Sequence, residues 1–272
     1  MSVPESVRYG QIDHDYATRL ATTPAGDDGP VWMVNLMSYR DAADYGQRAE
    51  PTISGREADD RYAPFESLAA VGAEIVFVGD VESQFFNETP TWDRVAVVKY
   101  PTRRSFIEMQ ARPEYQEKHV HKDAGMEQTI VMGCQPIDSP AFSAHGPDWA
   151  HVPHPPTDDD PAVMVLHVLR FTEGEALTDM QAYFDHASQI AGPHGARVAG
   201  WFGVEGTIVG DGRQWDQARF NAFPSREAFM AVALDPERLQ AQADHREVAI
   251  ADTYTMILRP GLDRLQVSLP AS

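Results

Sequence analysis

One stretch of sequence occurs twice in this chain, and it constrains the fold more than any other feature. The first copy runs from Trp92 to Tyr115 and the second from Trp215 to Arg238, at a constant offset of 123 residues and without a gap. Both copies open with Trp-Asp, carry an aromatic residue followed by proline near the middle, and have Pro-Glu close to the end. A repeat of this length indicates two copies of one structural unit.

The length of the chain fits this duplication. Its 272 residues accommodate two units of about 100 residues, which is a usual domain size. We expect the units at 30–136 and 162–261, after an N-terminal extension at 1–29 and before a C-terminal tail at 262–272. The segment 137–161 is rich in proline and aspartate and has no periodicity, so it is predicted to be a linker.

Apolar runs and helical periodicity follow the same order in both halves. In the first half, strands are expected at 31–39, 74–81, 92–100 and 129–134, with helices at 58–71 and at 105–121, the latter with a break or restart at Pro113. In the second half, strands are expected at 163–171, 196–204, 215–223 and 254–258, with helices at 178–190 and from Ser225 to about Ile250, interrupted at Pro236. The order βαββαβ is that of a ferredoxin-like unit, in the α+β class.

The bare face of each predicted sheet determines how the two units combine. A four-stranded antiparallel sheet with both helices on one face leaves the other face to be covered. The predicted strands are apolar on both faces, which favours packing the two sheets face to face. We therefore predict an intramolecular α/β barrel, with the functional cavity between the two sheets.

Composition excludes several classes of partner. The net charge of −19 disfavours nucleic acid and anionic membrane surfaces. No apolar run approaches the roughly 18 residues that span a bilayer, and the N-terminus does not resemble a signal peptide, so a cytoplasmic location is expected. The single cysteine, Cys134, excludes an internal disulfide and a cysteine-based zinc site, and it is predicted to be a buried small hydrophobe.

Several segments resemble the dimeric α/β-barrel superfamily. They are the strand VNLMSY (Val34 to Tyr39), the strand that begins Trp-Asp-Arg-Val-Ala, the turn YPTRRSF and the segment RPEYQ, and the likeness covers 31–136 and 162–260. The nearest branch consists of bacterial domains of unknown function whose first strand reads Asn-Leu-x-x-aromatic. The resemblance implies a cytoplasmic small-molecule protein, since members include cofactor-free monooxygenases, lactone isomerases, polyketide cyclases and haem enzymes.

The first strands of the two halves differ at polar positions. His167 stands where the first half has Asn35, and Phe171 stands where it has Tyr39. If this strand face lines the barrel interior, Asn35 and His167 both point into the pocket, and His167 is the best candidate for a general base. The alternative is a core histidine bonded to a backbone carbonyl.

The third strand of the second half is more polar than its counterpart. Arg219 and Asn221 stand where the first half has Ala96 and Val98. Facing inward, they could bind a carboxylate or enolate oxygen, the arginine through its planar fork. Facing outward, they would belong to a solvated edge strand.

The remaining candidates are single aromatic, methionine and histidine residues. We expect substrate contacts from Tyr39, Met37, Phe171, Trp92 and His119, although Trp92 also fits shared architecture and His119 also fits a cation near a helix C-terminus. No metal site is expected, because Asp13-His14-Asp15 fits a solvated turn and the linker histidines (His145, His151 and His154) lack a rigid scaffold. No cofactor is expected either; the histidines weighed as axial haem ligands are His186, His194 and His245.

These observations predict a cofactor-independent enzyme of isomerase, cyclase, lyase or monooxygenase type. It would act by proton transfer on an organic acid, a lactone or a polyketide-like molecule, with His167 as base and with Arg219, Asn35 and Asn221 holding the developing oxyanion. The alternatives are a non-catalytic binding or sensor protein and a haem protein. A homodimer of the fused barrel is a possible assembly.

Overall fold

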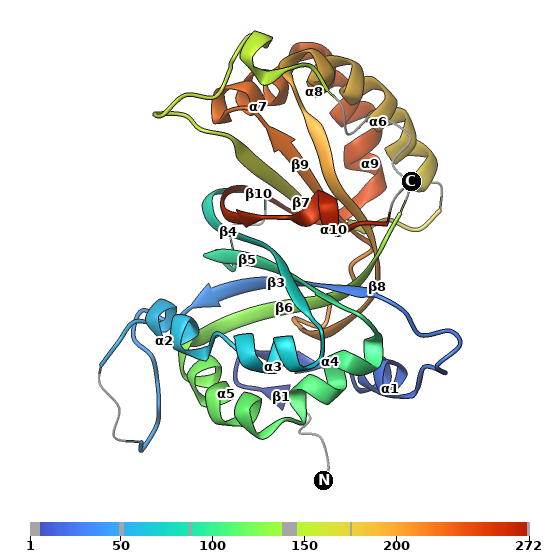
Figure 1. The fold of residues 1–272 in the computed structure, drawn as a ribbon. Coiled ribbons are helices and arrows are strands. Elements are labelled where there is room, and N and C mark those ends of the chain that lie inside the picture. Colours follow the sequence, from blue (N-terminus) through green and yellow to red (C-terminus); the bar gives the residue numbers. More distant parts are fainter. Residues whose placement is uncertain (1–5, 49–51, 87–88, 138–145, 175, 271–272) are drawn as a thin grey trace.

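The computed structural model describes residues 6–48, 52–86, 89–137, 146–174 and 176–270, and its centre is a closed antiparallel barrel of eight strands (Figure 1). Around the barrel, the strands follow the order β8 (Arg197–Gly210), β6 (Met126–Pro136), β3 (Val31–Tyr39), β5 (Arg94–Tyr100), β4 (Glu74–Phe85), β10 (Ile250–Asp263), β7 (Val163–Phe171) and β9 (Gln217–Phe223). Pairing of β8 with β9 closes the ring. Both seams between the halves, β6 with β8 and β4 with β10, are hydrogen-bonded pairs.

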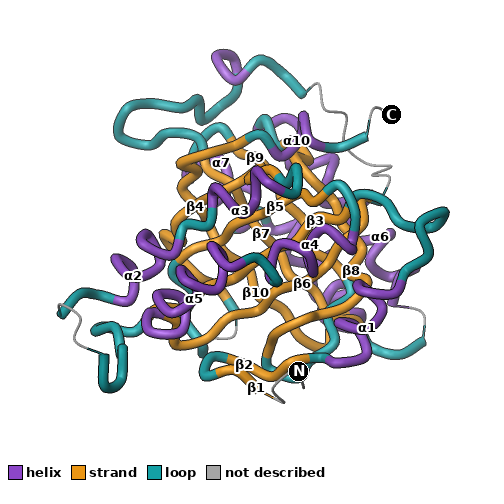
Figure 2. Tube along the Cα trace, turned by 60° about the horizontal axis from the view of Figure 1, so that its bottom comes forward, coloured by secondary structure: helices purple, strands orange, loops and turns teal. Residues whose placement is uncertain are grey.

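Helices cover the barrel on two opposite sides (Figure 1). Those of the first half are α2 (Gly55–Tyr62), α3 (Phe65–Ala70), α4 (Arg103–Gln110) and α5 (Pro113–Gly125), which cross the strands in Figure 2. Those of the second half are α6 (Ala176–Ala191), α7 (Arg226–Ala233), α8 (Pro236–Ala241), a π-helical turn (Gln242–Arg246) and α9 (Glu247–Ala249). The single helix predicted at 58–71 is two helices, because Pro64 interrupts it. None of the helices described is long and apolar enough to cross a bilayer.

The Trp-Asp pair of the repeat has the same structural role in both halves. Asp93 accepts a hydrogen bond from the backbone N–H of Tyr39 at 2.7 Å, and Asp216 accepts the equivalent bond from Phe171 at 2.7 Å. Each aspartate also uses its own backbone N–H and carbonyl to join two neighbouring strands. The preceding tryptophans, Trp92 and Trp215, both pack against Tyr254. The repeated motif therefore fixes strand ends and fills the barrel.

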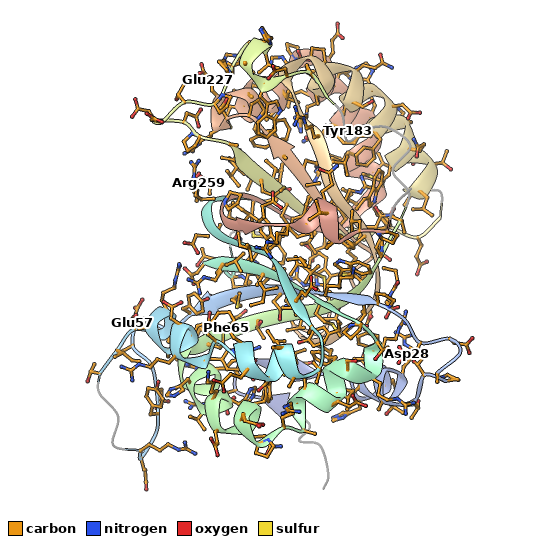
Figure 3. The ribbon with its side chains drawn as sticks, in the orientation of Figure 1. Asp28, Glu57, Phe65, Tyr183, Glu227 and Arg259 are labelled. Carbon is orange, nitrogen blue, oxygen red and sulfur yellow. The ribbon has the colours of Figure 1, made fainter. Side chains whose placement is uncertain are left out.

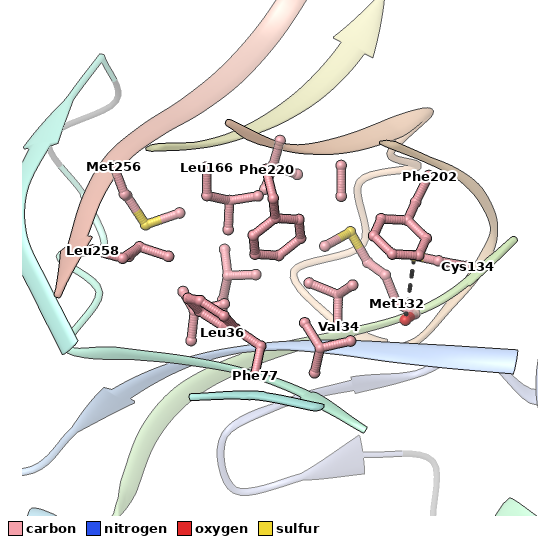
Figure 4. Close-up of a cluster of buried hydrophobic side chains, with 14 of the residues drawn as sticks. Val34, Leu36, Phe77, Met132, Cys134, Leu166, Phe202, Phe220, Met256 and Leu258 are labelled. Atoms are coloured by element: carbon pink, nitrogen blue, oxygen red, sulfur yellow. Dashed lines mark hydrogen bonds between the residues drawn. The ribbon is translucent and has the colours of Figure 1, made fainter. Parts of the chain in front are cut away.

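The space between the sheets is a packed apolar core and not a functional cavity (Figure 4). Val34 and Leu36 from the first half meet Leu166 and Phe220 from the second, and all four side chains are fully buried. The prediction of a site between the sheets is therefore wrong. Side chains alternate along a strand, so the residues between these core positions point outward, toward the helices. Those residues include Asn35, His167, Arg219 and Asn221, so the inward orientation considered for them in the sequence is not the one that the structure has.

Both ends of the chain pack onto the barrel. Described residues of the N-terminal extension form β1 (Ser6–Val7), β2 (Gly10–Ile12) and α1 (His14–Thr22), and β2 pairs with β8. Asp13 caps α1 by accepting a hydrogen bond from Tyr16 N at 2.9 Å. At the other end, α10 (Leu265–Ser268) places Ser268 against Trp32, whose indole N–H donates to the serine hydroxyl at 2.9 Å.

Candidate functional site

Two cavities lie between the barrel wall and the helices, one in each half. The first-half cavity, beneath α1 to α5, has a volume of about 1190 Å³. The second-half cavity, beneath α6 to α8 and the π-helical turn, has a volume of about 510 Å³. The predicted site residues are divided between them, so Asn35 and His167 do not share one pocket.

Strand register gathers the polar residues of the second-half cavity. His167 on β7 lies opposite Arg219 on β9 and opposite Thr255 on β10. Asn221 follows Arg219 by two residues and therefore points to the same side. Tyr183 from α6, labelled in Figure 3, closes the cavity on the helix side. Three of the predicted site residues (His167, Arg219 and Asn221) thus line one cavity, although it is not the one expected.

The guanidinium of Arg219 is held between two aromatic rings. Its central carbon lies 3.7 Å from the Phe184 ring centroid and 4.0 Å from that of Trp201. Nε donates to Gln217 Oε1 at 2.8 Å, and Nη2 donates to the same oxygen. The side chain is only 3% exposed, and Nη1 is buried without a hydrogen-bond partner among the described residues. Burial and the nearby Arg246 lower its pKa, but a guanidinium remains protonated at neutral pH.

Sequence reasoning missed Arg246, which adds a second buried guanidinium. It lies in the π-helical turn, is 6% exposed, and has Nη2 buried without a partner among the described residues. Arg238, which lines the same cavity, donates to Ala233 O at 2.6 Å and to Gln242 Oε1 at 2.7 Å. The spacing of Arg238, Gln242 and Arg246 at four-residue intervals places them on one helical face, and that signal could have identified them.

The second-half cavity carries positive charge without a carboxylate. The described residues that line it include three arginines and no aspartate or glutamate. None of the three arginines forms an ion pair with another described residue, whereas Arg94 and Arg213 elsewhere contact carboxylates. In a chain with a net charge of −19, this local excess of positive charge sets the cavity apart from the rest of the protein.

The imidazole of His167 is neutral in this environment. Its Nδ1 lies 3.0 Å from Thr255 Oγ1, and within the described part of the chain Nε2 has no hydrogen-bond partner. Burial, followed by the charges of Arg246, Arg219 and Arg238, holds its pKa well below 6.5. A neutral imidazole beside two guanidinium groups can accept a proton from a molecule whose negative charge the arginines hold.

The first-half cavity contains Asn35, Met37 and His119. The Asn35 amide donates to Met33 O at 2.9 Å. His119 Nε2 lies 3.1 Å from the Tyr9 hydroxyl, while its Nδ1 is buried with no partner among the described residues. Burial and Lys122 lower the pKa of His119, so this imidazole is also neutral at physiological pH.

The other predicted contacts do not line either cavity. Tyr39 donates its hydroxyl to Asp59 Oδ2 at 2.6 Å, Phe171 packs beside Leu169, and Trp92 belongs to the barrel core. The three histidines weighed as haem ligands also lie outside both cavities. His186 and His245 line a surface depression between α6 and α8, and His194 stacks on His154. No group of three metal-binding side chains occurs within the described ranges, and His145 lies outside them.

No protein-family model matches the chain, and no curated protein sequence does. Several solved structures are similar. An anthrone oxidase-like protein aligns with a TM-score of 0.53 at 13% identity, over 87% of this chain and 93% of the other. A protein of unknown function from Rhodopseudomonas palustris aligns with a TM-score of 0.41 at 24% identity, over 48% of this chain and 98% of the other. A mutant chlorite dismutase from Candidatus Nitrospira defluvii aligns with a TM-score of 0.48 at 11% identity, over 90% of this chain and 94% of the other.

The likeness to the anthrone oxidase-like protein concerns the fold. It covers most of both chains, and the shared architecture is the closed antiparallel barrel with helices on its outer faces. This chain therefore has the fold of the dimeric α/β-barrel proteins, formed within one polypeptide.

Proposed function

We propose that this chain binds a small organic acid or a related oxyanion in the second-half cavity and transfers a proton on it without a cofactor. The observation that carries the proposal is the pair of buried guanidinium groups, Arg219 and Arg246, that no carboxylate of the described residues neutralises. The reaction is of isomerase, cyclase, lyase or monooxygenase type, in a form that begins by removing a proton from an activated carbon.

The energetics of burial explain why a ligand is required. An unpaired charge in a protein interior is destabilising by several kcal/mol. Arg219 and Arg246 are nevertheless almost completely buried, and no described aspartate or glutamate lines the cavity that they share. A bound carboxylate or enolate would supply the missing negative charge, and the planar guanidinium fork suits two oxygens of one anion.

Substrate binding would also activate the base. The positive charges of Arg246, Arg219 and Arg238 help to depress the pKa of His167. A bound anion offsets those charges and raises the pKa of His167 toward its ordinary value. Nε2 then accepts the proton, Thr255 holds the ring through Nδ1, and the Asn221 amide can donate to the developing oxyanion.

The duplicated sequence supports the remaining features of this proposal. We interpret the two halves as tandem ferredoxin-like units, since each contains strand, helix, strand, strand, helix, strand in that order. On the resemblance of its first strand, we also propose that the chain is related to the bacterial branch with the Asn-Leu-x-x-aromatic strand. It is proposed to act in the cytoplasm, and a homodimer of the fused barrel is compatible with this arrangement.

Hydrogen exchange tests the proposal directly. The full chain is incubated in D₂O with enolisable 2-oxo acids, 3-oxo acids and lactones, and loss of the α-proton signal is followed by NMR. Wild-type protein should accelerate exchange of at least one acid. His167→Ala should reduce that rate by about 100-fold or more, the usual contribution of a general base. His151→Ala, a change at an exposed linker histidine, is the matched control.

Two outcomes decide between the hypotheses. If circular dichroism shows that His167→Ala is folded and its rate of α-proton exchange equals that of the wild-type chain, the mechanism is refuted. An organic acid that raises the melting temperature of the wild-type chain but not of Arg246→Met, with no exchange of any substrate, would instead favour a binding or sensor protein.

A further inference from the structure

The first-half cavity contains an amine that the proposed function does not use. The chain has only three lysines, Lys99, Lys118 and Lys122, and Lys122 alone lines this cavity. We propose that Lys122 is a reactive amine that forms an imine with a neutral, apolar aldehyde or ketone bound in the first-half cavity. This proposal is independent of the second-half cavity.

The three lysines differ in their partners. Lys99 donates to Ser268 O at 2.7 Å, and Lys118 donates to Ala63 O at 3.2 Å. Lys122 forms no hydrogen bond or ion pair with any residue in the described part of the chain. Its Nζ instead lies 5.4 Å from the Tyr62 ring centroid and 5.8 Å from that of Tyr9. The Lys122 amine is therefore the one not committed to a carbonyl oxygen.

Burial favours the neutral, nucleophilic form of this amine. Burial lowers the pKa of Lys122, and the nearby carboxylates of Asp59 and Asp123 only partly oppose it. Lys122 is half-buried, and the two aromatic rings beside its amine accept no strong hydrogen bond from it. Lysines that form imines in enzymes are activated in this way, by removal from solvent.

The walls of the cavity define the class of ligand. They are mainly apolar, and they include Leu68, Ile75, Val98, Phe106 and Met109. The two acidic residues of the lining, Asp59 and Asp60, contact Arg94 at 3.2 and 2.9 Å, so little charge remains to hold an ion. Phe65, which is 63% exposed and labelled in Figure 3, stands at the rim on α3. A volume of about 1190 Å³ accommodates a ring system or a medium-length chain.

His119 is placed to move the protons of this reaction. It precedes Lys122 by three residues on α5, so both side chains lie on one helical face. The amine lone pair of Lys122 adds to the carbonyl carbon, and one proton passes from nitrogen to the carbonyl oxygen to give a neutral carbinolamine. The hydroxyl then takes up a second proton, the C–O bond breaks with loss of water, and the resulting iminium nitrogen releases its last proton to give the imine, which replaces the proton taken up. His119 can relay these protons through Nδ1, while Nε2 contacts Tyr9.

Reductive trapping tests the proposal. The full chain is incubated with 2-naphthaldehyde and cyanoborohydride, digested, and analysed by mass spectrometry. We expect the secondary-amine adduct on Lys122 to exceed the adducts on Lys99 and Lys118 by at least tenfold. The preference should disappear in urea, and 2-naphthalenemethanol, which has the same shape but no carbonyl, should protect Lys122.

Variants provide matched controls. Lys122→Met should lose the dominant adduct, whereas Lys118→Met should retain it. Equal labelling of the three lysines in the folded chain, or no adduct on Lys122, would overturn the proposal. Because the selectivity is measured in the wild-type chain, the result does not depend on whether Lys122→Met folds.

Discussion

Individual arginines of this chain lie in contrasting environments. Arg94 contacts the carboxylates of Asp59, Asp60 and Asp80, as expected for a partly buried cation in an acidic protein. Arg246 is more deeply buried than Arg94 but forms no ion pair with a carboxylate of the described residues. The difference between these two arginines separates a structural ion-pair network from a ligand site, because only the first is neutralised within the chain.

Replacing these arginines should therefore change stability in opposite directions. Arg246→Met removes an uncompensated buried charge and should raise the free energy of unfolding of the ligand-free chain by about 1 kcal/mol or more. Arg94→Met leaves the buried Asp59 carboxylate without its cation and should lower that free energy by about 3 kcal/mol. Urea denaturation measures both changes. A marked loss of stability in Arg246→Met would show that the arginine has a structural role.

The pKa of His167 predicts how stability depends on pH. Burial, followed by the charges of Arg246, Arg219 and Arg238, holds this pKa well below 6.5 in the folded chain, so the unfolded chain binds the proton first as pH falls. The contribution of His167 to stability is complete above about pH 6.5 and is lost as pH falls toward the depressed folded pKa. His167→Gln should therefore reduce the loss of stability between about pH 7 and 5, by up to about 1.4 kcal/mol per pH unit.

Comparing the wild-type chain with His167→Gln isolates the contribution of His167 to the pH dependence of stability. His119 and His194, whose pKa values are also lowered, are present in both, so they do not contribute to the difference. Denaturant titrations at several pH values provide the measurement. Parallel stability curves for the wild-type chain and His167→Gln would contradict the prediction.

At the scale of strands, sequence reasoning identified which residues share a face but not which face is interior. Alternation separates Val34 from Asn35 and Leu166 from His167, and the structure keeps those pairs on opposite sides of the barrel wall. Both faces of these strands are mostly apolar, because one packs against helices and the other against the opposite strands. Polarity alone therefore could not decide the orientation, and the site was predicted on the wrong side of the wall.

The N-terminal helix α1 shows a second limit of sequence reasoning. Residues 1–29 are polar in composition, and the buried pair Tyr16 and Leu20 was too short a pattern to predict a packed helix. Tyr16 lies directly over two glycines of the barrel, Gly133 and Gly206. The contact depends on residues far apart in sequence, and it makes α1 part of the first-half cavity.

A methyl group at Gly206 should therefore displace α1. A Cβ there would lie 2.5 Å from Tyr16 Cδ2, which is closer than side-chain atoms can approach. We expect Gly206→Ala to lower the free energy of unfolding by about 1–3 kcal/mol, as for overpacked cores, and to increase hydrogen–deuterium exchange in α1. Gly203→Ala is the control, since its Cβ would meet only Ile137 Cγ2 at 3.5 Å. Unchanged exchange in α1 would refute the packing argument.

At the scale of the whole molecule, one scaffold supports two chemically different cavities. The repeated Trp-Asp motif makes equivalent hydrogen bonds in both halves, and the barrel core combines side chains from both. The cavities lie outside that core, so their lining residues can diverge without disturbing the packing that holds the halves together. Sequence comparison of the two copies found this divergence at Arg219 and Asn221. It could not find Arg246 or Lys122, because neither lies on a strand of the repeat.

The shared core predicts that the two halves unfold together. Phe220 from β9 is fully buried, with its ring centroid 5.5 Å from that of Phe77 on β4 and 6.1 Å from that of Phe202 on β8. Phe220→Ala removes contacts across the barrel and should lower the free energy of unfolding by about 3–5 kcal/mol.

Because β4 belongs to the first half and β9 to the second, this loss should affect both halves equally. Calorimetry should show one transition in the wild-type chain and one, at lower temperature, in the variant. Hydrogen–deuterium exchange should accelerate in β3 and β6 as much as in β7 and β9. Two separate transitions, with the first half unaffected by Phe220→Ala, would mean that the halves are independent domains that merely adjoin.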